Sequence, residues 1–121
     1  MTSIPHSLKI LQFCLLFAYA TYVSLTPYPP EATEIISDKI IHAAGYFLLY
    51  FSSDFAFAPN RLWLRKFLLL FAYSGFIEVC QYFIPNRSCS LLDMVANLAG
   101  LLLGLGACIW VHRLRSGSPD A

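Results

Sequence analysis

The side chains of this sequence that could do chemistry are acids, bases and amides set inside apolar stretches. An ionised side chain at the centre of a membrane-spanning helix costs about 2.5 to 3.5 kcal/mol on insertion scales, so it usually marks a site for a ligand, an ion or a proton. Almost every ionisable residue within the apolar stretches falls at the same end of its stretch. This asymmetry favours recognition of a charged group, or acid–base chemistry, at one face of a membrane.

Three of the stretches carry a polar stripe at helical spacing, with side chains three or four residues apart on one face. The stripes are Lys39, His42 and Tyr46 in the second stretch, Ser74, Glu78 and Gln81 in the third, and Asp93 and Asn97 in the fourth. Each stripe lies near one end of its stretch, so the arrangement of the helices decides whether the stripes meet.

The elements that would position these stripes are membrane-spanning helices. The chain has 121 residues, of which 58% are hydrophobic and 12% charged, a balance too apolar for a small water-soluble domain. A helix needs about 20 apolar residues to cross a core about 30 Å thick, so four spans use almost the whole chain. The sequence predicts an all-α integral membrane bundle of four transmembrane helices, in a single domain over residues 1–121. The predicted spans are 8–26, 39–58, 62–84 and 91–112, followed by a flexible tail over 113–121.

Three boundaries carry specific expectations. The first span contains Ala18-Tyr19-Ala20, which mimics a signal-peptide cleavage site, but the apolar pattern continues to Leu25 and favours a retained span. The link over residues 27–38 is rich in proline and acids, and Ser37 or Asp38 is the expected N-cap of the second span. Pro59-Asn60 is expected to form a tight turn.

Basic residues predict the orientation, because loops rich in Lys and Arg stay in the cytoplasm. One side receives Lys9, Arg61, Arg65, Lys66, Arg113 and Arg115, and the other receives Lys39 and Arg87. Both termini are therefore expected in the cytoplasm, with the polar stripes at the external face.

An up-and-down bundle brings the start of the second span, the end of the third and the start of the fourth to one membrane face. The stripes then converge, and Arg87 lies in the link between the last two spans. Candidates for acid or base catalysis are Glu78, Asp93 and His42, and candidates for ligand binding are Lys39, Tyr46, Gln81, Arg87 and Asn97.

A structural explanation of the same residues remains open. Asp93 lies near a helix start, where the positive end of the helix dipole stabilises a carboxylate. Lys39 is long enough to reach lipid headgroups. Glu78 lies six residues inside its predicted span, about 9 Å deep, and needs a partner such as Arg87, Lys39 or His42. A polar knot that only locks three helices together would use the same side chains.

Several other classes of site find no support. The chain has no phosphate-binding glycine loop, no Gly-x-Ser-x-Gly and no His-Glu-x-x-His, and no metal or cofactor is predicted. The four cysteines form no Cys-x-x-Cys pair and indicate packing residues. A formal charge of +1 gives no electrostatic reason for a nucleic-acid partner. Gly100-x-x-x-Gly104 allows close helix contact, either within the bundle or between two copies, so the oligomeric state is open.

The polar pattern resembles that of the VanZ-like family of small membrane proteins, named after a component of glycopeptide (teicoplanin) resistance. The shared pattern is Asp38-Lys39-x-x-His42-x-x-x-Tyr46, then Glu78-x-x-Gln81 and Pro85-x-Arg87, then Asp93-x-x-x-Asn97-x-x-Gly100-x-x-x-Gly104. The resemblance covers residues 25 to 110. It implies a multi-pass protein of the bacterial cytoplasmic membrane, connected with the cell envelope and, in some members, with reduced susceptibility to teicoplanin. It brings no established reaction.

The sequence and the resemblance together favour a pocket that binds or processes an amphiphilic envelope molecule related to a lipid or a glycopeptide. The expected partners are membrane lipids and an anionic lipid or glycopeptide ligand. Two alternatives stay open: a binding module without catalysis, and an accessory subunit whose polar groups only hold helices together.

Overall fold

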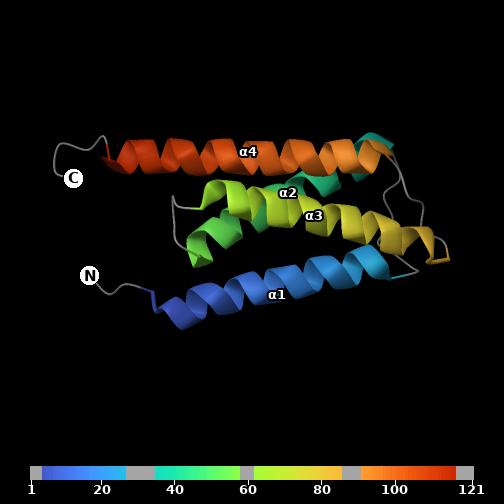
Figure 1. Ribbon diagram of the computed structural model, residues 1–121, viewed down its shortest axis with the longest axis horizontal. Helices are drawn as coiled ribbons and strands as arrows, with labels where there is room; N and C mark the ends of the chain where they lie inside the picture. Colours follow the sequence, from blue (N-terminus) through green and yellow to red (C-terminus); the bar gives the residue numbers. More distant parts are fainter. Residues whose placement is uncertain (1–3, 27–34, 58–61, 86–90, 117–121) are drawn as a thin grey trace.

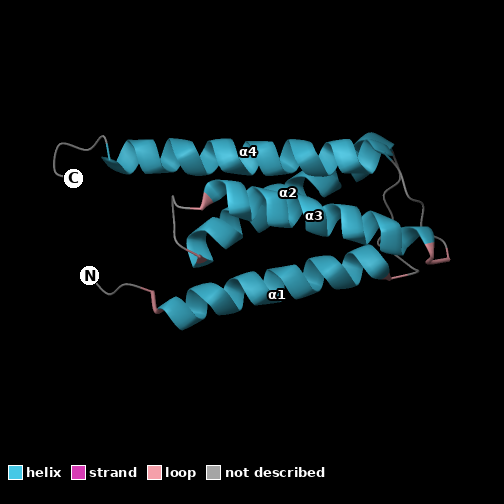
Figure 2. Cartoon of the chain, viewed as in Figure 1, coloured by secondary structure: helices cyan, strands magenta, loops and turns pink. Residues whose placement is uncertain are grey.

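The part of the chain that the computed structural model describes consists of helices with short loop segments at their ends and contains no strand (Figure 2). The described residues are 4–26, 35–57, 62–85 and 91–116. The four helices are α1 (His6–Leu25), α2 (Ile35–Ala56), α3 (Trp63–Tyr82) and α4 (Leu91–Ser116). The prediction of an all-α chain with four helices is confirmed.

The helices run alternately up and down in one bundle (Figure 1). At one end, called the Leu91 end, α1 and α3 finish and α2 and α4 begin; at the other, called the His6 end, α1 and α3 begin and α2 and α4 finish. This topology brings the three polar stripes of the sequence to the Leu91 end.

Glycines set the close contact between α2 and α4. A Cβ atom added at Gly100 would fall on the carbonyl oxygen of Ala43 and lie 3.0 Å from its Cα, and one added at Gly104 would lie 2.9 Å from the Cβ of Tyr50. Only a residue without a side chain fits at this distance from the α2 backbone. Contact within the bundle therefore accounts for the Gly100-x-x-x-Gly104 pattern, and it fixes the polar residues of α2 against those of α4.

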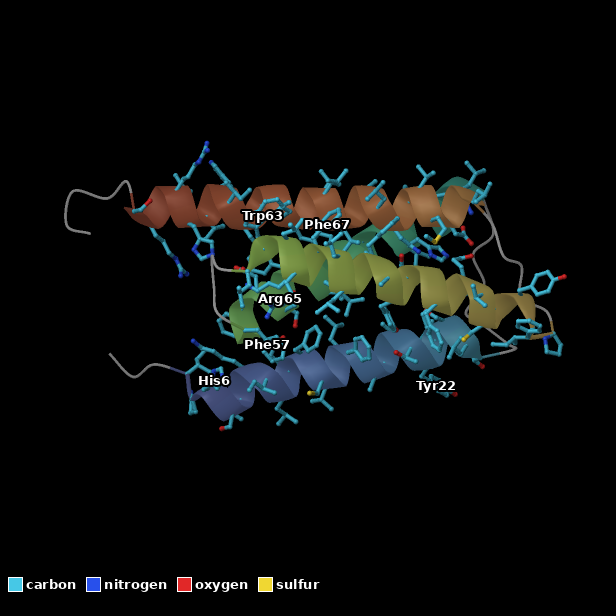
Figure 3. The ribbon with its side chains drawn as sticks, viewed as in Figure 1. His6, Tyr22, Phe57, Trp63, Arg65 and Phe67 are labelled. Atoms are coloured by element: carbon cyan, nitrogen blue, oxygen red, sulfur yellow. The ribbon has the colours of Figure 1, made fainter. Side chains whose placement is uncertain are left out.

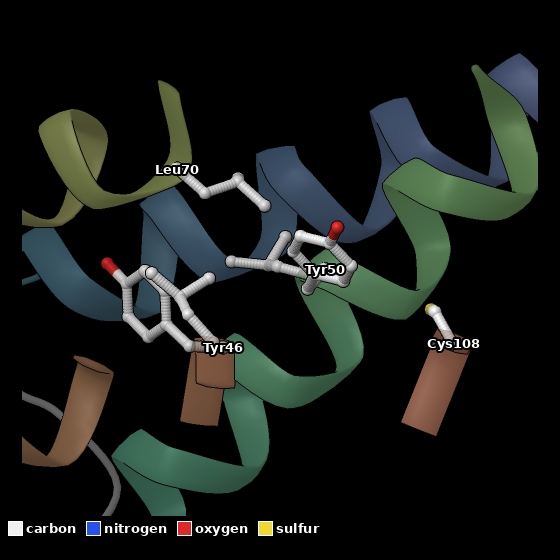
Figure 4. Packing of buried hydrophobic residues seen from close by; sticks show 6 residues of the cluster. Tyr46, Tyr50, Leu70 and Cys108 are labelled. Carbon is white, nitrogen blue, oxygen red and sulfur yellow. The ribbon is translucent and has the colours of Figure 1, made fainter. Parts of the chain in front are cut away.

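The apolar core lies in the middle of the bundle (Figure 4). Leu49, Tyr50 and Leu101 are at most 2% exposed. The hydroxyl groups of Tyr46 and Tyr50 point away from each other in Figure 4, with their rings in the core. An apolar layer thus separates the polar groups of one end from those of the other.

Helix α1 is the peripheral member, with no fully buried residue. Hydrogen bonds tie it to its neighbours: the Gln12 side-chain amide donates to the Ser52 carbonyl at 3.1 Å, and the Ser52 hydroxyl donates to Gln12 Oε1 at 2.7 Å. The hydroxyls of Thr21 and Tyr73 lie 2.5 Å apart, linking α1 to α3. These contacts agree with a retained first helix, which stays a prediction.

The outer surface of the bundle is apolar. Two of the described helices, α1 and α4, are long and apolar enough to cross a membrane. Large hydrophobic side chains also face outward from α2 and α3, including Ile40, Leu48, Phe51, Leu68, Leu69 and Phe76. Water does not favour such a surface, whereas acyl chains do.

Two helix boundaries differ from those expected. Helix α2 begins at Ile35, so Ser37 and Asp38 lie inside it and neither is the N-cap. The sequence has no proline between Pro30 and Ser37, so no residue there prevents the helix from starting before Ser37. Helix α4 continues past His112 to Ser116, so residues 113–116 of the expected flexible tail are helical. Its last turn carries Arg113 and Arg115, whose positive charges interact favourably with the negative end of the helix dipole and stabilise the helix there. The expected Pro59-Asn60 turn and residues 117–121 lie outside the described residues.

Candidate functional site

The starts of α2 and α4 meet through charged and polar side chains at the Leu91 end. The Lys39 ammonium forms an ion pair with Asp93 Oδ1. One turn along, His42 Nδ1 lies 3.1 Å from Asn97 Oδ1 and His42 Nε2 lies 3.8 Å from Asp93 Oδ1. An amide oxygen only accepts, so Nδ1–H is the donor to Asn97. Lys39 and His42 are three residues apart on one face of α2, and Asp93 and Asn97 are four residues apart on one face of α4. The close packing of α2 against α4 brings these two faces together.

Glu78 joins this group from the end of α3. Glu78 is buried, with only 3% of the residue exposed. One ligand-type atom from each of His42, Glu78 and Asp93 lies within 4.8 Å of the other two. The first polar cluster is thus drawn from three helices and comprises Lys39, His42, Glu78, Asp93 and Asn97.

The first polar cluster is buried at its acids and accessible at its bases. The side chain of Asp93 is 7% exposed, whereas those of Lys39 and His42 are 26% and 20% exposed. A charged group that approaches the cluster from outside the bundle would meet the ammonium and the imidazole before the carboxylates. The carboxylates would act from behind, by orienting the bases or by accepting a proton.

Three predicted site residues lie outside the hydrogen bonds and ion pairs described above, although Tyr46 is close enough to Glu78 to interact with its charge. Tyr46 is 7% exposed and lies in the apolar core, with its ring 6.3 Å from that of Tyr73. Gln81 donates from Nε2 to the Ser24 carbonyl of α1 at 2.9 Å, so it ties α3 to α1. Arg87 lies outside the described residues.

A second polar cluster lies at the His6 end and was not anticipated from the sequence. Asp54 of α2 accepts from Lys66 Nζ of α3 at 2.8 Å through Oδ1, and its Oδ2 lies 3.0 Å from His112 Nε2 of α4. The side chains of Lys66, Asp54 and His112 are 7%, 10% and 17% exposed. The second polar cluster comprises Asp54, Lys66 and His112.

This finding corrects the expectation that almost every ionisable residue within the spans falls at one end. Lys66 was counted among the basic residues facing the cytoplasm, but its ammonium is buried on Asp54. The signal was present in the sequence. Asp54 near the end of α2, Lys66 near the start of α3 and His112 near the end of α4 must converge in an up-and-down bundle.

An apolar groove of about 410 Å³ lies between α1 and α2, away from the first polar cluster. It is lined by Gln12, Leu16, Leu48, Phe51, Ser52 and Phe55. None of the predicted site residues is among its lining. The groove therefore belongs to the apolar outer surface of the bundle and is not the pocket expected from the sequence.

The model of one protein family, described as VanZ/LLP1, matches residues 25–112 of the chain. The chain belongs to the VanZ/LLP1 family. The VanZ/LLP1 match takes in α2, α3 and α4 as far as His112, and so includes both polar clusters. It confirms the resemblance read from the polar pattern. VanZ/LLP1 membership, together with two helices apolar enough to span a bilayer, indicates a membrane protein. No curated protein and no solved structure matches the chain.

Proposed function

We propose that this VanZ/LLP1 protein crosses the bacterial cytoplasmic membrane four times, and that its first polar cluster binds or processes the charged headgroup of an amphiphilic cell-envelope molecule. The Leu91 end faces outward and both termini face the cytoplasm. The observation that carries the proposal is the convergence of an ammonium, an imidazole, an amide and two carboxylates from three helices at one end of an apolar bundle.

The burial of the charges supports four spans. Helices α2 and α3 contain more ionisable residues than α1, but Asp54, Lys66 and Glu78 are at most 8% exposed. Their charges face other helices, and the outward faces of α2 and α3 carry mainly large apolar side chains, with Arg65 exposed near the start of α3. A helix of this kind inserts as part of a bundle even where its average hydropathy is modest.

The accessible bases favour an anionic headgroup. Lys39 and His42 are the more exposed members of the cluster. Arg87 follows in the link before α4 and would add a planar fork suited to phosphate or carboxylate. The acyl part of the ligand would remain among the exposed hydrophobic side chains of the helices, where lipid already lies.

A catalytic and a binding version of this proposal make different predictions for Glu78. If Glu78 or Asp93 acts as a base on the bound molecule, Glu78→Gln keeps the shape of the side chain but abolishes the reaction while the ligand still binds. If the protein only binds its ligand, Glu78→Gln is tolerated and loss of Lys39 or Arg87 weakens binding.

A structural role is the second candidate, and one observation favours it. The Lys39–Asp93 ion pair and the His42–Asn97 hydrogen bond both join α2 to α4. A polar knot of this form would hold the helices together without any ligand. Substitutions in the cluster would then lower the yield of folded protein and produce no ligand-specific defect.

Native mass spectrometry of protein gently extracted from bacterial membranes tests the proposal. We expect an envelope lipid to be retained by the parent protein and by Glu78→Gln, and to be lost from Lys39→Ala and Arg87→Ala. His6→Ala, at an exposed position of the opposite end, is the control for folding and extraction. If no lipid is retained by any form, and the cluster variants yield less folded protein than the parent and His6→Ala, the structural role replaces the proposed one.

A further inference from the structure

We infer that the first polar cluster is a binding site for one divalent metal ion of the zinc or manganese type, with His42, Glu78 and Asp93 as its protein ligands. The inference concerns the cluster itself. It deepens the proposed function, on which it rests only for the identity of the headgroup.

Geometry is the first support. One ligand atom from each of the three side chains lies within 4.8 Å of the other two, and the His42 Nε2 to Asp93 Oδ1 distance is 3.8 Å. Nitrogen and oxygen ligands sit about 2.0 to 2.2 Å from zinc, so two ligands of one ion lie about 3 to 3.5 Å apart. A movement of about 1 Å, within reach of side-chain rotation, would close the set around an ion.

The orientation of the imidazole is the second support. His42 Nδ1–H donates to Asn97 Oδ1, which leaves Nε2 as the nitrogen that faces Asp93. A metal-binding histidine usually donates a hydrogen bond from its second ring N–H to an oxygen atom. This contact fixes the tautomer in which the other ring nitrogen can bind the metal. Asn97 therefore stands where a supporting residue of a metal site stands.

Charge is the third support, and the second polar cluster provides the comparison. There Lys66 contributes +1 and Asp54 contributes −1, so with neutral His112 the cluster sums to zero. The first polar cluster has the same Lys, Asp and His, but Glu78 adds a second buried carboxylate and the sum is −1. Two buried carboxylates and an imidazole nitrogen that face one point favour a cation between them.

The bound ion would change what Lys39 does. Lys39 now holds the Asp93 oxygen that faces His42 Nε2, so its ammonium and the metal ion compete for one carboxylate oxygen. When the ion binds, Lys39 is released toward the open side of the cluster. The formal charge summed over these five side chains and the ion changes from −1 to +1, which strengthens the attraction of the site for a phosphate group.

One imidazole with two carboxylates suits Zn²⁺ or Mn²⁺ better than Ca²⁺, which prefers six to eight oxygen ligands. The test uses full-length protein in detergent, freed of metal with a chelator and of lipid by detergent exchange. Zn²⁺ is titrated by calorimetry, and Mn²⁺ by the loss of its free electron paramagnetic resonance signal. We expect one ion per chain.

Variants decide whether the ion sits in this cluster. Glu78→Gln, Asp93→Asn and His42→Ala should each weaken binding at least tenfold, and Asn97→Ala by about 10- to 100-fold. Lys39→Met should tighten binding, because it removes the competing ammonium. This gain cannot come from misfolding. His112→Ala, the matched histidine of the second polar cluster, should bind like the parent.

Absence of stoichiometric binding to the parent overturns the inference, as does unchanged affinity in Glu78→Gln and Asp93→Asn, or a loss of affinity in Lys39→Met. Since no lipid is present in these titrations, their result is independent of the proposed function. Metal binding without lipid retention in native mass spectrometry would support the metal site and count against the headgroup.

Discussion

Asp54 is the residue on which the second polar cluster depends. Its Oδ1 lies 2.8 Å from Nζ of Lys66 on α3, and its Oδ2 lies 3.0 Å from Nε2 of His112 on α4. One carboxylate therefore joins three helices. Both basic partners are largely buried. Removing the carboxylate would take the paired negative charge away from a buried ammonium, and breaking a buried ion pair at one partner is strongly destabilising.

We expect Asp54→Ala to lower the free energy of unfolding by about 3 to 5 kcal/mol, because it removes one partner of a buried ion pair. The double change Asp54→Leu with Lys66→Met should recover much of the loss by replacing the pair with apolar groups. Denaturant-induced unfolding in detergent micelles, followed by circular dichroism, measures both. A double variant no more stable than Asp54→Ala would contradict this account.

Tyr50 offers a second prediction at this scale. Its ring is fully buried, and among the described residues its hydroxyl has no hydrogen-bond partner. We expect Tyr50→Phe to leave the midpoint of thermal unfolding unchanged or to raise it, because a buried unsatisfied hydroxyl stabilises nothing. Tyr50→Ala should cost about 3 to 5 kcal/mol through the cavity it leaves. A marked loss of stability in Tyr50→Phe would show that the hydroxyl has a partner in the membrane.

Helix α4 is placed against α2 by its glycine face, and this contact aligns both polar clusters. Gly100 lies against Ala43 and Gly104 against Tyr50, whereas Gly106 has open space at the position of a Cβ. The three glycines share one helix, so they separate the effect of close packing from that of helix propensity.

We expect Gly100→Ala to destabilise the bundle by about 1 to 3 kcal/mol, because its methyl group would overlap the α2 backbone. Gly106→Ala should be neutral, or should stabilise the helix by up to about 1 kcal/mol. Thermal unfolding in the same detergent compares them. Gly100→Ala should also weaken any ligand or metal that bridges α2 and α4, while equal behaviour of the two variants would remove the glycine contact from the account.

The whole molecule has two polar ends separated by an apolar middle, and its basic residues are unequally divided. Arg65, Arg113 and Arg115 are exposed at the His6 end, and Lys9 lies there with its ammonium 5.1 Å from the centre of the Phe55 ring. Lys66 is buried and no longer counts toward that surface. Figure 3 shows Trp63 toward the His6 end and Tyr22 toward the Leu91 end, and both are exposed, as is typical of aromatic side chains that anchor a protein at membrane–water interfaces.

We expect the His6 end to face the cytoplasm, because the exposed basic residues gather there. Fusions of alkaline phosphatase, which is active only outside the cytoplasm, should be inactive at both termini and active in the link over residues 86–90. Green fluorescent protein, which folds in the cytoplasm, should be fluorescent at both termini. An active phosphatase at either terminus would reverse the orientation and place the second polar cluster outside.

The sequence alone determined the helical class, the number of helices and the polar stripes of the first polar cluster. These features are local: apolar length, proline positions and spacings of three and four are legible along the chain. The predicted helix ends were wrong at Ser37 and at residues 113–116. The local sequence marks a helix end sharply only where a proline or glycine interrupts the helix.

Only the tertiary structure decided which polar side chains meet. Helical spacing assigns Gln81 to the same stripe as Glu78, yet Gln81 turns to α1 while Glu78 reaches His42 and Asp93. From the sequence Lys66 is expected at the surface, but in the structure it is buried and paired with Asp54, which also lies against His112. Which neighbour a stripe faces depends on helix rotation and separation, and these are set by contacts such as Gly100 against Ala43 between residues far apart in the chain.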